Sequence, residues 1–158
     1  MTLDARTTIG HIHLTVSDLE RALAFYRDVL GFDVTTRYGR DAVFLSAGGY
    51  HHHIGLNTWA GRGAPAPPRG ATGLYHFAIL YPDRAALARA VRRVLDHQVA
   101  LEGAADHGVS EAVYLRDPDG NGVELYRDRQ EKDWPRGPDG RLVMHTLPLD
   151  LEALLAEA

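Results

Sequence analysis

The feature that most constrains this fold is an internal repeat with a spacing of 65 residues. A shift of 65 superposes His11 on His76 and Asp18 on Asp83. In each copy, a β-rich apolar stretch leads into a residue that can cap a helix, and an amphipathic helix pattern follows. A unit of this size cannot bury its apolar face alone, so the repeat predicts two similar modules that pack together.

The first copy has the pattern of a strand, a helix and three more strands. Ser17 followed by Glu20 three residues later has the form of a capping box. Gly31 suits the left-handed position that ends a helix. The expected elements are a strand at residues 9–16, a helix at 18–30 and strands at 32–38, 42–46 and 51–58.

The second copy repeats this order, with Asp83 able to cap its helix. Its expected elements are a strand at residues 74–81, a helix at 84–97 and strands at 99–102, 111–116 and 123–126. We therefore predict an α+β fold in which two tandem βαβββ modules, at about residues 8–58 and 73–127, form a cupped mixed sheet. Residues 59–72, dense in Gly and Pro, predict a linker between the modules of a single domain, residues 1–127.

The composition narrows the classes of function. The chain has 158 residues, of which 45% are hydrophobic, so it is long enough to bury one substantial hydrophobic core. A net charge of −4 without runs of Lys or Arg argues against nucleic acid as a partner. The absence of cysteine excludes thiolate nucleophiles and Cys-rich metal sites. No stretch has the length of a signal peptide core or a membrane span, so we expect a cytoplasmic protein without a membrane partner.

Strand alternation places the side chains that carry chemistry on one face. His11 and His13 alternate with apolar neighbours that must pack on the helix, so both imidazoles face the concave side of the sheet. The same rule directs His76 and Glu124 to that side. Two imidazoles and one carboxylate brought together in this way predict a metal site with positions left open for substrate.

Three stretches of the chain form an ordered set: HIHLTVSDLERALAFYRDVLGF, HFAILYPDRAALARAV and YLRDPDGNGVELY. Together they resemble the vicinal oxygen chelate superfamily, which includes glyoxalases, fosfomycin and bleomycin resistance proteins and extradiol catechol dioxygenases. The resemblance covers about residues 8–127. Two finer matches, GGYHHHIGLNTW and DHGVSEAVYLRDPDGNGVELY, are most similar to the catechol 2,3-dioxygenase branch, especially the first half of its longer bacterial members.

In that branch the metal ligands are a His on the opening strand of each module and a Glu on the final strand. The resemblance therefore implies His11, His76 and Glu124 as ligands. Glyoxalases of this fold use a fourth protein ligand on the last strand of the first module, and aligning IGLNT with VELYR puts Gly55 there. Glycine cannot coordinate through a side chain, so three positions stay open, enough for a bidentate catecholate and O2.

The resemblance also assigns residues around the metal. Tyr114 stands where the dioxygenases place an active-site tyrosine, ten residues before Glu124. His107 resembles their histidine near the bound catecholate, although the segment between His107 and Tyr114 is slightly shorter here. His53 shares strand parity with Gly55, so we expect His53 or His107 to move protons during catalysis.

Several of these residues have a second interpretation. His13 is a candidate for contacting the substrate or supporting the ligands, and it equally suits a filled core position. His51 either contacts the substrate or lies at a polar strand edge, whereas His52 is expected to point away from the concave face. Trp59 is a candidate for stacking on a flat ligand. Tyr114 also has a plain packing interpretation.

The function that this pattern implies is Fe(II)-dependent extradiol cleavage of a small catechol-like aromatic substrate by O2, with Mn(II), Zn(II) and Ni(II) as alternative metals. Two rival functions remain. One is another enzyme of the superfamily, a metal-dependent isomerase or thiol transferase. The other is a metal-free binding protein of the resistance type, which would hold a flat ligand in the cup.

Residues 128–158 lose the repeat pattern. They predict a polar extension that ends in a short amphipathic helix, LDLEALLAEA, docked on the body of the protein or on a twin subunit. In longer relatives a second pair of modules follows such a stretch. A homodimer is the expected substitute here.

Overall fold

The computed structural model describes residues 2–68 and 70–158. The chain divides into two compact units, Met1–Ala66 and Pro67–Ala158, and the boundary falls inside the predicted linker. No helix among the described residues has both the length and the apolar character needed to cross a membrane.

The first unit is a βαβββ module, as predicted. Its helical part changes from an α-helix to a π-helix along its length. Its elements are β1 (Ile12–Thr15), α1 (Leu19–Leu23), the π-helix η1 (Ala24–Val29), β2 (Asp33–Tyr38), β3 (Ala42–Ser46) and β4 (Ile54–Asn57). The sheet order is β1-β4-β3-β2, in which β1 runs parallel to β4 and the other pairs are antiparallel.

The start of α1 differs from the prediction. The N-cap is Asp18, in extended backbone, and its carboxylate accepts a hydrogen bond from the Arg21 N–H at 2.9 Å. The expectation that Ser17 and Glu20 form a capping box is therefore wrong. Asp18 is one residue closer to the helix, and its carboxylate accepts a hydrogen bond from a first-turn N–H that has no partner within the helix. The helical part ends as expected at Gly31, whose φ of 89° is left-handed.

Strand parity in the first unit is confirmed. Leu14 and Val16 are buried, whereas His13 and Thr15, which alternate with them along the chain, are exposed. The buried side chains join those of the helical part, including Leu23 and the fully buried Tyr26, to make the core of this unit.

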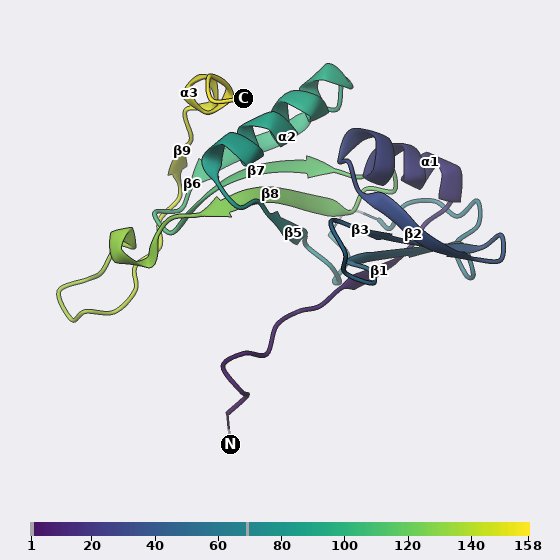
Figure 1. Cartoon of the computed structure of the whole chain (residues 1–158), viewed down its shortest axis with the longest axis horizontal. Coiled ribbons are helices and arrows are strands. Elements are labelled where there is room, and N and C mark those ends of the chain that lie inside the picture. The colour runs from purple at the N-terminus through teal and green to yellow at the C-terminus, as the bar shows by residue number, and fades with distance from the viewer. Residues whose placement is uncertain (1, 69) are drawn as a thin grey trace. The chain divides into compact units, whose positions relative to one another are not determined.

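The second unit contains the second βαβββ module. Its elements are β5 (Phe77–Leu80), α2 (Arg84–Asp96), β6 (Leu101–Asp106), β7 (Ser110–Arg116) and β8 (Gly122–Asp128). Asp83 caps α2 as predicted, accepting the Ala86 N–H at 2.7 Å. Leu87, Val91 and Val94 of α2 are fully buried, and the helix lies over the sheet of this unit (Figure 1).

The C-terminal segment (residues 129–158) adds structure that the sequence pattern did not predict. A short 3-10 turn, η2 (Glu131–Asp133), leads to a two-residue strand, β9 (Leu147–Pro148), and then to the expected helix, α3 (Leu151–Leu155). Strand β9 pairs with β6, so the second sheet has the order β5-β8-β7-β6-β9. Helix α3 packs beside α2 with Leu154 fully buried (Figure 1).

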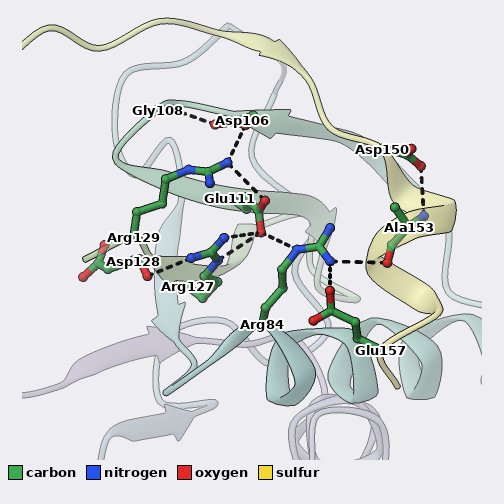
Figure 2. Close-up of polar contacts among 10 residues, drawn as sticks. All are labelled: Arg84, Asp106, Gly108, Glu111, Arg127, Asp128, Arg129, Asp150, Ala153 and Glu157. Carbon is green, nitrogen blue, oxygen red and sulfur yellow. Dashed lines mark hydrogen bonds and ion pairs between the residues drawn. The ribbon is translucent and has the colours of Figure 1, made fainter. Parts of the chain in front are cut away.

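A buried carboxylate helps to hold the C-terminal segment on the second unit. Glu111 of β7 accepts the Nε–H groups of Arg84 and Arg127, both at 2.9 Å, and an N–H of Arg129 at 3.2 Å. The side chain of Glu111 is only 7% exposed. As Figure 2 shows, Arg84 reaches on from this carboxylate to Glu157 and to the Ala153 carbonyl of α3. The cluster therefore links the body of the sheet to the end of the chain.

We expect Glu111→Gln to lower the free energy of unfolding by about 3 kcal/mol, because removing one partner of a buried ion pair leaves the guanidinium charges uncompensated. Urea unfolding measures this change. Glu102→Gln is the matched control: its pair with Arg116 is 2.8 Å long but about half exposed, and its removal should cost less than about 1 kcal/mol. Equal losses for the two variants would contradict the interpretation of Glu111 as the buried centre of the cluster.

Candidate active site

The central contact of the second unit joins a histidine to a glutamate. His76 directly precedes β5, and Glu124 lies on β8, which runs parallel to β5. The Nε2 atom of His76 is 3.0 Å from Oε2 of Glu124. The Glu124 side chain is 12% exposed and that of His76 33% exposed, so the carboxylate is sheltered while the imidazole meets solvent on one side. Two of the three predicted metal ligands therefore do come together.

Gly122 makes this approach possible. A Cβ atom at this position would lie 2.2 Å from the carbonyl oxygen of Tyr75 and 2.9 Å from Cβ of His76. A side chain at residue 122 would therefore push the chain before β5 away from β8. The glycine in the GNG turn is needed for this close packing as well as for the turn itself.

Tyr114 and His107 extend the contact into a chain of polar groups. Tyr114 lies directly opposite Glu124 in the antiparallel pairing of β7 with β8. Its hydroxyl is 3.3 Å from Oε1 of Glu124 and 2.7 Å from Nε2 of His107. Tyr114 therefore lies beside Glu124, and His107 reaches the same group of residues in spite of the shortened segment.

The environment of Tyr114 keeps its hydroxyl protonated. Burial, together with the nearby charge of Glu124, raises the pKa of Tyr114 to about 12. The group is therefore a neutral phenol near pH 7, able to donate a hydrogen bond.

These side chains border a cavity of about 350 Å³ in the second unit. His76, Tyr114 and His107 line it, together with Thr146 from the C-terminal segment. Its volume lies at the lower end of the range of about 300–1,000 Å³ for small-molecule sites. One aromatic ring with short substituents is a ligand of suitable size.

The first unit presents the equivalent positions without the carboxylate. In its sheet His13 of β1 pairs with Gly55 of β4, and in the second sheet Ala78 of β5 pairs with Glu124 of β8. Since residue 13 corresponds to residue 78 in the repeat, Gly55 occupies the position of Glu124, as the sequence alignment predicted. A Cβ at Gly55 would lie 2.9 Å from Cγ of His13, so the imidazole of His13 covers the space that a side chain there would use.

The run of histidines before β4 differs from the prediction. Strand β4 begins only at Ile54, so residues 51–53 lack the strand alternation on which the prediction relied. His52 stacks against His11 with ring centroids 4.5 Å apart and against Phe44 at 5.0 Å. Burial, followed by repulsion from His11, lowers the pKa of His52. The expectation that His52 points away from this face is therefore wrong.

The neighbouring histidines are placed differently. Nδ1 of His53 accepts a hydrogen bond from the Ala47 N–H at 3.3 Å and is 3.0 Å from the Ser46 hydroxyl. His51 stacks on Tyr50 and is exposed. Thus His53 is tied to the end of β3, while His51 lies at the surface.

Trp59, the predicted stacking platform, is 59% exposed and lies beside His13 with ring centroids 5.5 Å apart. Both residues belong to the first unit. The exposed indole ring of Trp59 remains a candidate surface for a flat ligand.

Neither unit, over residues 2–68 and 70–158, contains by itself a group of three or more His, Cys, Asp or Glu side chains arranged to hold a metal ion. His11 belongs to the first unit, whereas His76 and Glu124 belong to the second. The structure shows the His76–Glu124 pair, and the three-ligand centre stays a prediction.

Sequence reasoning missed two residues beside the site. The main-chain carbonyl of His145 is 2.9 Å from Nδ1 of His107. Thr146, which follows it, lines the cavity. No sequence pattern marked either residue, because the contact uses a main-chain atom and depends on the pairing of β9 with β6.

Comparison with known proteins identifies relatives for nearly the whole chain. Residues 8–125 match the model of the Glyoxalase/Bleomycin resistance protein/Dioxygenase superfamily. The chain is 47% identical over 152 residues to a catechol-2,3-dioxygenase of Bacillus subtilis, covering 96% of this chain and 52% of the relative. It is 33% identical over 121 residues to biphenyl-2,3-diol 1,2-dioxygenase 3 of Rhodococcus globerulus, covering 76% and 63%. The chain thus spans about half to two thirds of the length of these relatives.

A solved structure agrees with this family. The chain superposes on lactoylglutathione lyase from Agrobacterium tumefaciens with a TM-score of 0.59 and 29% identity, covering 78% of this chain and 96% of that one. Two more distant relatives are named for a metal. They are the manganese-dependent 2,3-dihydroxybiphenyl 1,2-dioxygenase of Geobacillus genomosp. 3, at 28% identity, and the metallothiol transferase FosB of Staphylococcus epidermidis, at 27%.

We expect Gly122→Ala to lower the free energy of unfolding by about 1–3 kcal/mol, because the added methyl group has no room against the Tyr75 carbonyl. The displaced His76 should lose its contact with Glu124, which NMR of the imidazole would detect. Gly103→Ala is the matched control, since a Cβ at this strand position of β6 meets nothing within 4 Å. An unchanged His76 resonance in Gly122→Ala would show that the glycine does not control the contact.

Proposed function

The chain belongs to the glyoxalase/bleomycin resistance protein/dioxygenase superfamily, and on this premise we propose that it acts as a metal-dependent extradiol dioxygenase that opens a catechol-like ring with O2. The observation that carries the proposal is the contact between His76 and Glu124 beside a cavity that fits one aromatic ring. The 47% identity to a catechol-2,3-dioxygenase supports the choice of reaction.

The donor atoms of this pair fit a divalent metal ion. Imidazole nitrogen and carboxylate oxygen are the ligands of two-His, one-carboxylate Fe(II) oxygenases, and Mn(II) accepts the same donors. Nε2 of His76 and Oε2 of Glu124 lie 3.0 Å apart, close enough that both could hold one divalent ion. We propose His76 and Glu124 as ligands and His11, the equivalent of His76 in the first module, as the third.

The metal, when bound, would supply Lewis-acid and redox chemistry that brings the catechol oxygens and O2 together. Gly55 supports a dioxygenase over an isomerase of the glyoxalase type. It stands at the position equivalent to Glu124, where a fourth protein ligand would come from the first module, and it has no side chain to coordinate with. Fewer protein ligands leave more positions for substrate and O2.

Tyr114 and His107 are the proposed acid–base groups. The hydroxyl oxygen of Tyr114 can accept a proton from a substrate hydroxyl in the cavity while its own proton passes to Nε2 of His107, which lies 2.7 Å away. A proton can therefore pass between the substrate and Nε2 of His107 through Oη of Tyr114. We prefer His107 over His53 for this role, because Nε2 of His107 is in hydrogen-bond contact with the Tyr114 hydroxyl.

The direct test is to load the full chain with Fe(II) without oxygen, add a catechol, admit air and follow the yellow ring-fission product. We expect product from the native chain, and we expect His76→Ala and Glu124→Ala to lose metal and at least about 100-fold in activity. His97→Ala is the control, since His97 is exposed at the end of α2. Bound metal without product from any of several catechols would end the proposal and leave an isomerase or thiol transferase as the better interpretation.

Tyr114→Phe tests the acid–base assignment. We expect kcat to fall by about 100-fold, the size typical of a lost proton-transfer group, with little change in bound metal because the phenol is not a ligand. Steady-state kinetics and metal analysis of the same preparation measure both quantities. A native kcat in this variant would exclude Tyr114 from proton transfer.

A further inference from the structure

The side chain of His107 is held by the main chain of the C-terminal segment. Nδ1 of His107 lies 2.9 Å from the carbonyl oxygen of His145, and the N–H of His145 donates back to the His107 carbonyl at 3.3 Å. A carbonyl oxygen can only accept a hydrogen bond, so the proton of this contact must reside on Nδ1 of His107.

We propose that the C-terminal segment contributes to the active site, because the carbonyl of His145 in this segment fixes the tautomer of His107. This inference rests on the proposed function for its catalytic meaning, although the tautomer itself does not. A neutral imidazole with its proton on Nδ1 presents an unprotonated Nε2 to the Tyr114 hydroxyl. His145 is thus a positioning residue that acts through His107.

The tautomer decides what His107 can do. With the proton on Nδ1, Nε2 accepts the Tyr114 hydroxyl proton across 2.7 Å, a shorter contact than the 3.3 Å from that hydroxyl to Oε1 of Glu124, and is ready to receive this proton. With the proton on Nε2, the imidazole would instead donate to Tyr114 and would not serve as its base. The His145 carbonyl therefore selects the form of the imidazole that the proposed proton transfer needs.

The C-terminal segment is anchored well enough to hold this contact. At its start the Arg129 N–H donates to the Val109 carbonyl at 2.8 Å. At its end the Arg92 side chain donates to the Leu155 carbonyl at 2.8 Å, and Leu154 is fully buried. Between these anchors β9 pairs with β6, directly after His145 and Thr146. The carbonyl is consequently held in place from both sides.

The turn next to His107 is adapted to this packing. Gly108 has a left-handed φ of 77°, and a Cβ there would lie 2.6 Å from Cε1 of His145 and 2.6 Å from Cγ of Pro135. The Gly108 N–H donates to Asp106, which also binds Arg129 at 2.6 Å. Only glycine leaves room for the C-terminal segment to lie against this turn.

Gly140 offers a matched control. It has the same φ of 77° and also belongs to the C-terminal segment, but a Cβ there would meet nothing within 4 Å. Alanine at either position therefore introduces the same backbone strain. Only alanine at residue 108 also pushes against His145.

The first test measures the tautomer in the native full chain. ¹⁵N NMR of the imidazoles in the metal-free protein, with His107 assigned by comparison with His107→Gln, should show the neutral ring protonated on Nδ1. A neutral His107 protonated on Nε2 would overturn the proposal. This measurement needs no activity and no folded variant other than the one used for assignment.

The second test compares Gly108→Ala with Gly140→Ala. We expect Gly108→Ala to shift His107 toward a mixture of tautomers and to lower kcat by about 10-fold or more with KM for catechol and bound metal nearly unchanged, whereas Gly140→Ala keeps the native spectrum and kcat. A native tautomer and a native kcat in a folded Gly108→Ala would overturn the proposal. If the native chain shows no ring cleavage at all, the proposed function fails, while the NMR result still decides the role of His145.

Discussion

The contact between His76 and Glu124 is the constraint on which the site depends. It exists because β5 and β8 run parallel as neighbours, which brings the residue before one strand next to the third residue of the other. Gly122 allows the two backbones to approach closely enough for the side chains to meet. Tyr114 and His107 then take their positions from the pairing of β7 with β8 and of β6 with β7. The sheet of the second unit therefore brings the His76–Glu124 contact and the Tyr114–His107 contact together at one cavity.

The same architecture in the first unit has a different chemical content. There His13 lies across from Gly55 at the register where the second unit has Ala78 and Glu124. One module thus offers a carboxylate and the other a glycine covered by an imidazole.

Much of the fold could be predicted from the sequence, because strand alternation and helix caps are local signals and occur in both copies of the repeat. The order of the elements, the cap at Asp83 and the alternation of exposed His13 with buried Leu14 come from spacing that any strand or helix must obey. The prediction failed where alternation ended: residues 51–53 lie outside β4, so His52 turned toward His11. The C-terminal strand β9 was not predicted, because a strand of two residues has no recognisable sequence pattern.

Anomalous diffraction at the iron edge from crystals of the Fe(II)-loaded chain tests whether His76 and Glu124 bind one metal ion. We expect a single strong peak at about 2.1 Å from Nε2 of His76 and from a carboxylate oxygen of Glu124. A fully loaded crystal with its iron peak elsewhere, or with His76 and Glu124 still in direct contact and no ion between them, would contradict it.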